Sequence, residues 1–294
     1  MGGALGRLAG LVQLIRYRFL LVAGLLPYAL GAALAFHVHQ TFDLFFFLVG
    51  LLGLFFALLG VEAFNEYFDW QLGTDRVFQL HPKPVTKRTF FVGWGAFFLA
   101  GLIGVYLSWQ VGWAIIIFAG FGFLGAYCYL GPPLKLTYRG LGELVIALCY
   151  GPLMTAGSFY LQAHRLEAFP LLVTLVPGLL LFAIALVNEV PDFLQDRLVG
   201  KRNLCVRLGP KRTVRLYSLI IVGFYFLVPM AYYKGIFPGL TLLALLCIPL
   251  SLVGFFVARK SYENPRRFVL VIRLLLIQYV FVLGIFITAY LVKP

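Results

Sequence analysis

The feature that most limits how this chain can fold is a series of nine long apolar stretches. An α-helix rises about 1.5 Å per residue, so some 20 apolar residues cross the roughly 30 Å hydrocarbon core of a bilayer. The sequence therefore predicts an all-α polytopic membrane protein with nine transmembrane helices, folded as a single membrane-embedded domain over residues 1–294. The expected spans are at about 19–36, 44–69, 90–109, 112–130, 141–162, 169–190, 214–233, 239–258 and 269–291.

The composition excludes a soluble globular domain. The mean hydropathy is +0.95, and only 12% of residues are charged, against about a quarter in soluble domains. A transmembrane β-barrel is also excluded, because its strands would give segments of about ten residues that alternate in polarity. The four cysteines form no CxxC pair, so they predict neither a disulfide framework nor a zinc site.

Basic residues give the chain a net charge of +13, and they flank the apolar spans. If the nine spans are correct, 21 of the 24 Lys and Arg residues fall on one side of the membrane and three on the other. That side is expected to be cytoplasmic, with the N-terminus inside, in a cell-membrane protein. The basic charge is thus explained by topology and the lipid bilayer, and we expect no nucleic-acid partner.

Seven of the eleven acidic residues lie in two short stretches, 62–75 and 189–196. The stretches follow the second and sixth spans, so both should emerge on the cytoplasmic side. Each follows the second helix of a group of four, which suggests two four-helix halves plus a ninth helix around a cavity open to the cytoplasm. Carboxylates beside long apolar runs are costly to desolvate, and this makes them candidates for function.

The first stretch spaces its polar residues by four. Asn65 and Asp69 would share one face of a helix, because residues four apart are offset by only about 40°. Gly73 is expected to end that helix and to let the chain turn Asp75 back toward the same place.

The second stretch repeats the spacing with Asn188, Asp192 and Asp196, which would also line one face. Pro191 removes a backbone donor, so it should kink or unwind the last turn of the sixth span and aim the two aspartates inward.

Rows of oxygen ligands on two facing helices are typical of a Mg²⁺ site. Mg²⁺ is usually held by one or two carboxylates together with substrate phosphates, so the two stretches predict a Mg²⁺-bridged diphosphate. The alternative is that these acids are ordinary helix ends at the membrane surface. Carboxylates at helix C-termini oppose the helix dipole, which disfavours that alternative. The expected metal ligands are Asp69, Asp75, Asp192, Asp196 and Asn65.

With both stretches in place, the chain resembles the UbiA superfamily of intramembrane prenyltransferases over essentially its whole length. The two motifs look like the aspartate-rich motifs of that superfamily. Further runs look most like the branch that prenylates 1,4-dihydroxy-2-naphthoate in menaquinone biosynthesis. These runs are Tyr138–Glu143, Gly151–Leu153, Gly200–Leu204 and Arg207–Gly209.

The resemblance implies an enzyme that ionises an isoprenyl diphosphate with Mg²⁺ and transfers the prenyl group to an aromatic acceptor. With 1,4-dihydroxy-2-naphthoate, attack would occur at the ring carbon that bears the carboxylate, and CO₂ would leave. The implied catalytic residues are Asp69, Asp75, Asp192, Asp196 and Lys135. The implied substrate-binding residues are Asn65, Asn188, Tyr129, Lys135, Arg139, Lys83 and Arg18.

Two departures from the branch leave the acceptor open. Pro191 stands where the branch often has Arg, and the run 81–84 stands where it usually has Arg-Pro. Other acceptors are 4-hydroxybenzoate, homogentisate or a glycerol-phosphate ether lipid. A secondary transporter is the alternative from another class, because such proteins also carry acids on broken helices. A transporter would hold them near the centres of its spans, whereas both stretches here lie at span ends.

Overall fold

The computed structural model describes residues 22–73, 84–166 and 171–292, and all regular secondary structure in this part of the chain is helical. The first helix is Val22–His39. The elements that follow are α2 (Leu44–Leu72), α3 (Lys87–Val111), α4 (Ala114–Leu130), η2 (Leu136–Arg139), α5 (Gly142–Leu148), η3 (Cys149–Leu153), α6 (Met154–Ala163), α7 (Leu171–Asn188), α8 (Phe193–Leu198), α9 (Leu204–Leu208), α10 (Pro210–Tyr233), η4 (Gly239–Cys247), α11 (Ile248–Ser261) and α12 (Pro265–Leu291).

Each of the nine predicted stretches coincides with a helical segment. Within the described residues, eight segments are long and apolar enough to cross a membrane; α4, with 17 residues, is apolar but shorter. Two spans are composite, because Gly142–Ala163 joins α5, η3 and α6, and Gly239–Ser261 joins η4 and α11. The chain is therefore an all-α integral membrane protein with about eight candidate spans.

The first acidic stretch lies at the end of α2, and this helix has defined caps. At its start the Asp43 carboxylate accepts a hydrogen bond from the Phe46 N–H at 3.0 Å. At its end Gly73 adopts the left-handed conformation (φ +85°), and its N–H donates back to the carbonyls of Asp69 and Trp70. The predicted helix end at Gly73 is confirmed.

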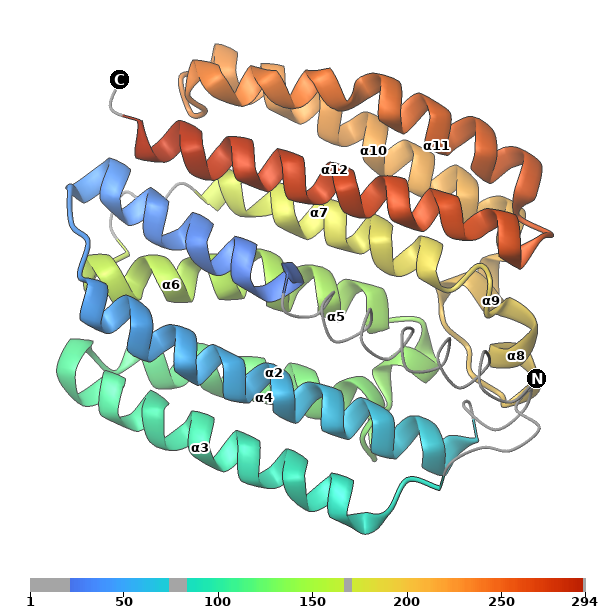
Figure 1. Ribbon diagram of the computed structural model, residues 1–294, viewed down its shortest axis with the longest axis horizontal. Helices are drawn as coiled ribbons and strands as arrows, with labels where there is room; N and C mark the ends of the chain where they lie inside the picture. Colours follow the sequence, from blue (N-terminus) through green and yellow to red (C-terminus); the bar gives the residue numbers. More distant parts are fainter. Residues whose placement is uncertain (1–21, 74–83, 167–170, 293–294) are drawn as a thin grey trace, which may run out of the picture.

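The centre of the bundle is α7. Its sequence is apolar on every side, as expected of a helix enclosed by others. It packs against α5, α10 and α12. Figure 1 shows α2, α3 and α4 on one side of this helix and α10, α11 and α12 on the other. The C-terminal ends of α2 and α7 lie at the same end of the molecule, beside α8 and α9, so the two acidic stretches emerge together as predicted (Figure 1).

The fifth span contains a wide turn where it crosses α7. Pro152 has no backbone N–H, and the N–H of Met154 reaches back to the Cys149 carbonyl, so η3 is a π-type turn inside the helix. At this turn Gly151 lies against α7: a Cβ added to it would be 2.8 Å from the Gly178 Cα. The close approach of the two backbones fixes the position of the turn.

This contact predicts that Gly151→Ala destabilises the protein by about 1–3 kcal/mol, because the new methyl group meets backbone atoms. Gly223→Ala is the matched control, since Gly223 is exposed in α10 with open space around it, and it should leave stability unchanged or raise it slightly. Thermal unfolding midpoints in one detergent would compare the two. Equal midpoints would contradict the close contact.

Candidate active site

Carboxylates from the two acidic stretches lie near each other at the end of the bundle where α2 ends. Asp69 in α2 is 7% exposed and Asp196 in α8 is 1% exposed. The charge of Asp69 acts on Asp196, so the two side chains are close in space although they are far apart in the sequence. The structure thus joins one aspartate from each motif in a single buried cluster.

Lys201 supplies the positive charge of this cluster. Its Nζ lies 3.5 Å from the Asp196 Oδ1, and the Asn203 Nδ2 donates to the Asp196 Oδ2 at 2.6 Å. Burial lowers the pKa of Lys201, but the carboxylates of Asp196 and Asp69 outweigh it, so the net pKa is raised and the ammonium is retained. Burial raises the pKa of Asp196 by more than Lys201 and Asn203 lower it. Such a buried group of charges depends on its internal pairing.

The loop after α8 is folded back so that Lys201 reaches Asp196. Gly200 has φ +75°, and the Lys201 N–H donates to the Asp196 carbonyl at 2.9 Å. Asn203 then caps α9, because its Oδ1 accepts from the Val206 N–H at 2.8 Å while its amide nitrogen holds Asp196. Asn203 therefore links the start of α9 to the carboxylate cluster.

A second carboxyl pair supports this loop from beneath. The Glu143 Oε1 accepts from the Leu204 N–H at 2.7 Å, and the Glu189 Oε2 accepts from the Cys205 N–H at 3.4 Å. The two carboxyl groups also lie near each other. Burial, and next the neighbouring Glu143 carboxyl, raises the pKa of Glu189 well above its usual value, so Glu189 keeps a proton that the pair can share.

The second acidic stretch does not form one continuous face. Helix α7 ends at Asn188, and Asp192 occupies the capping position before α8, so the helix is interrupted around Pro191 as expected. The interruption turns Asp196 into the buried cluster, but Asp192 is exposed and Asn188 is half-buried. The prediction that all three residues share a face was wrong because the chain turns between them.

Asn65 lies one helical turn before Asp69. Its Oδ1 atom is buried and accepts no hydrogen bond from any residue that the structure describes. Tyr129, at the end of α4, interacts electrostatically with Lys201. Both residues line the large cavity described below.

The basic residues that were predicted to surround the diphosphate make no described contact with the carboxylate cluster. The Lys135 ammonium makes no ion pair or hydrogen bond within residues 22–73, 84–166 and 171–292. Arg139 is exposed, and its Nη2 donates to the Pro133 carbonyl at 3.3 Å. Asp75, Lys83 and Arg18 lie outside the described residues.

Sequence reasoning did not single out Lys201, Asn203, Glu143 or Glu189 as site residues. All four belong to short runs that the resemblance had marked or to the second acidic stretch itself. Their pairing depends on contacts between α5, α8 and α9, and a local sequence pattern does not predict contacts between distant helices. The available signal was that a charged residue such as Glu143, at the start of an apolar span, needs a partner.

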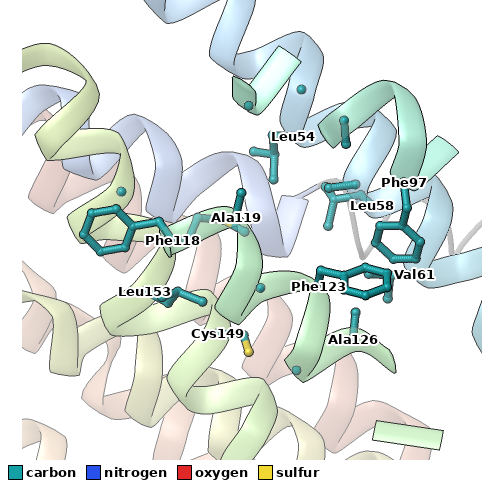
Figure 2. Close-up of a pocket in the computed structure, with 18 of the residues that line it drawn as sticks. Leu54, Leu58, Val61, Phe97, Phe118, Ala119, Phe123, Ala126, Cys149 and Leu153 are labelled. Carbon is teal, nitrogen blue, oxygen red and sulfur yellow. The ribbon is translucent and has the colours of Figure 1, made fainter. Parts of the chain in front are cut away.

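A cavity of about 770 Å³ adjoins the cluster. It is lined by α2, α3, α4 and the span from α5 to α6, and Figure 2 shows the mainly apolar side chains that form its wall. Asn65 and Tyr129 stand at the end nearest the carboxylates. Several lining residues of α3 and α4 are exposed, so the cavity also reaches the outer surface along these two helices.

The donors in this site fit Mg²⁺ bound together with a phosphate. The part of the chain that the structure describes holds no group of three or more His, Cys, Asp or Glu side chains arranged for a metal ion. Mg²⁺, however, commonly takes only one or two carboxylates and completes its shell with water and substrate phosphates. Asp69, Asp196 and the unpartnered Asn65 Oδ1 offer that kind of donor set.

The carboxyl pair predicts how stability depends on pH. Glu189 binds its proton more tightly in the folded than in the unfolded chain, so stability falls as pH rises from about 4.3, the unfolded value, through the raised folded pKa. Glu189→Gln can donate to Glu143 without a titrating proton. It should therefore flatten the loss of thermal stability between pH 5 and 8.

Glu263→Gln, an exposed acid before α12, is the control and should keep the wild-type pH dependence. The same slope for Glu189→Gln and wild type would contradict the shared proton.

Some known proteins with related sequences carry names that include a naphthoate or a naphthoquinone. The chain is 27% identical over 209 residues to the 1,4-dihydroxy-2-naphthoate octaprenyltransferase of Bacillus subtilis, covering 67% of this chain and 66% of the relative. It is 26% identical over 227 residues to the 2-carboxy-1,4-naphthoquinone phytyltransferase of Synechocystis, covering 76% of this chain and 74% of that one. The chain thus spans about two thirds to three quarters of these relatives.

Solved structures share the fold over almost the entire chain. A UbiA homologue from Aeropyrum pernix superposes with a TM-score of 0.66 at 14% identity, covering 92% of this chain and 96% of the homologue. A UbiA homologue from Archaeoglobus fulgidus, solved with DMAPP and Mg²⁺, gives a TM-score of 0.60 at 16% identity, covering 91% and 99%. Residues 24–288 match the UbiA prenyltransferase family, and this chain belongs to that family.

Proposed function

We propose that this protein transfers a prenyl group from an isoprenyl diphosphate to 1,4-dihydroxy-2-naphthoate, as a Mg²⁺-dependent enzyme of menaquinone biosynthesis. The observation that carries the proposal is a buried charged cluster next to a long apolar cavity, with Tyr129 lining the cavity and interacting with Lys201 of the cluster. The diphosphate end of a prenyl diphosphate matches the charged cluster, and its hydrocarbon end matches the apolar cavity. The names of the relatives from Bacillus subtilis and Synechocystis support a naphthoate-type acceptor.

In this proposal Asp69, Asp196 and Asn65 hold the metal and the diphosphate, with Asp75 and Asp192 from the same motifs. Bound Mg²⁺ supplies Lewis-acid neutralisation of the charge that develops on the leaving diphosphate. Lys201 adds a positive charge that burial and pairing keep in place. Lys135 and Arg139 belong to the neighbouring loop and would approach the diphosphate from there, together with Asn188, Tyr129, Lys83 and Arg18. The active site would face the cytoplasm, because most basic residues flank this end of the spans.

The transfer would break the allylic C–O bond, and the electron pair would leave with the diphosphate. A new C–C bond forms to the ring carbon that carries the carboxylate. The carboxylate then leaves as CO₂, and its bonding pair restores the aromatic ring, so no external oxidant or base is needed. The apolar wall in Figure 2 would keep water away from the allylic cation, which water would otherwise trap.

The length of the cavity sets how much prenyl chain it can hold. Its lining runs along α2 from Asn65 to Gly50, about 15 residues or roughly 22 Å of helix. An isoprene unit adds four chain bonds, roughly 4.7 Å when extended, so about five units fit. A longer chain would leave through the outer surface between α3 and α4, where Gly101 and Gly120 line the cavity with open space around them.

The direct test uses purified protein, octaprenyl diphosphate and a panel of acceptors that includes 1,4-dihydroxy-2-naphthoate, 4-hydroxybenzoate and homogentisate. We expect a decarboxylated prenyl-naphthalenediol, loss of the activity with EDTA, and recovery with Mg²⁺. Transfer only to another acceptor would overturn the naphthoate assignment. Lack of prenyl transfer to every acceptor would overturn the proposed activity.

The carboxylate cluster predicts the effect of removing one charge. Asp69→Asn and Asp196→Asn should each lower kcat/KM by about 10²-fold or more, because charge stabilisation of a leaving group depends on preorganised partners. Glu263→Gln removes an exposed carboxylate on the same side and should leave kcat/KM unchanged. Rates would be compared per folded molecule after size-exclusion chromatography. Near-normal rates in both Asn variants would indicate that Asp69 and Asp196 are ordinary helix-end residues with no role in catalysis.

The lateral exit predicts a dependence on chain length. Gly101→Phe would narrow the cavity where it reaches the surface, so it should slow octaprenyl transfer while dimethylallyl transfer stays near the wild-type rate. Gly95→Phe is the control: Gly95 is exposed on the same helix with open space around it, but it does not line the cavity. An equal effect of Gly101→Phe on both donors would rule out this exit.

A further inference from the structure

Tyr150 lies in the cavity wall and has no part in the mechanism above. It is the second residue of the π-type turn Cys149–Leu153 in the fifth span. Its hydroxyl is buried and forms no hydrogen bond with any part of the chain that the structure describes. Buried hydroxyls in folded proteins are nearly always paired, so this one calls for a partner from outside the chain.

Tyr28, which lines the same cavity, shows the usual situation. Its hydroxyl donates to the Phe47 carbonyl at 2.8 Å. The Tyr28 hydroxyl therefore has an internal partner, whereas the Tyr150 hydroxyl has none among the described residues. A ligand with an oxygen atom at this position would satisfy its hydroxyl.

The position of Tyr150 is fixed by the backbone around it. The next residue, Gly151, packs directly on Gly178 of α7, and Pro152 prevents the turn from closing into a regular helix. A π-type turn in a helix often marks a functional position, because it changes the direction of the side chains that follow the regular pattern. The backbone that carries Tyr150 is thus held in place.

Tyr150 also lies where the cavity meets the polar site. It interacts electrostatically with Glu62, one turn before Asn65 on α2, and with Tyr129 on α4. Tyr129 in turn interacts with Lys201 of the carboxylate cluster. With the diphosphate at the cluster and the prenyl chain in the cavity, the allylic carbon would lie between them, close to Tyr150.

We propose that the Tyr150 hydroxyl hydrogen-bonds a ring oxygen of the aromatic acceptor and so orients the ring carbon that is prenylated. This inference rests on the proposed function. The ligand class is an aromatic ring with hydroxyl or carboxylate substituents. The prenyl chain has no polar atom to offer, and most of the cavity lining is apolar, so the hydroxyl gives the acceptor one of its few polar contacts.

Equilibrium binding of 1,4-dihydroxy-2-naphthoate and of octaprenyl diphosphate with Mg²⁺ would test the proposal without depending on turnover. Tyr150→Phe keeps the ring and removes only the hydroxyl. We expect it to weaken acceptor binding about tenfold, as for the loss of one hydrogen bond, and to leave the affinity for the diphosphate unchanged. Tyr28→Phe removes a paired hydroxyl in the same cavity and should change neither affinity.

Unchanged acceptor affinity in Tyr150→Phe would overturn the inference, and so would a selective loss of diphosphate affinity. If wild type binds the acceptor through Tyr150 but transfers no prenyl group, the proposed activity fails while this contact stands. Should Tyr150→Phe fail to fold, the wild-type protein still gives a test. It should bind 1,4-dihydroxy-2-naphthoate about tenfold more tightly than naphthalene analogues without oxygen substituents, and equal affinities would contradict the contact.

Discussion

The rest of the site depends on the ion pair between Lys201 and Asp196, with the Asp69 carboxylate near enough to act on both. Burying ionised groups is costly unless each has a partner, and here one ammonium serves carboxylates from two distant parts of the chain. The pairing joins the end of α2 to the loop after α8. It also leaves two carboxylates beside each other, an arrangement that is favourable only with positive charge nearby. A metal–diphosphate complex would bring further positive and negative charge to the same place.

The charged cluster and the apolar cavity lie next to each other, and a few polar side chains of the cavity wall lie between them. Asn65, Tyr129 and Tyr150 line the cavity and carry polar atoms at the end near the carboxylates, while the wall beyond them is mostly aliphatic or aromatic. A substrate with a diphosphate head and a hydrocarbon tail therefore has its two halves in separate environments. The reacting carbon would lie at the boundary, where water is excluded and a few hydroxyl and amide groups set the direction of attack.

Much of the fold could be predicted because it follows from local physics. The length of each apolar stretch predicts a span, Gly73 ends α2 as its conformational freedom suggests, and both acidic stretches emerge at the same end. The partners of the carboxylates could not be predicted. Asp192 is exposed because the chain turns at Pro191, and Lys201 reaches Asp196 only because Gly200 folds the loop back.

The central claim is that Asp69 and Asp196 act in one metal–diphosphate site, and a double-mutant cycle tests it most directly. The affinity for octaprenyl diphosphate with Mg²⁺ would be measured for wild type, Asp69→Asn, Asp196→Asn and the double variant. A shared site predicts that the double variant loses less binding free energy than the sum of the single losses, by about 1 kcal/mol or more. Losses that add to within roughly 0.5 kcal/mol would show two independent residues and contradict the account.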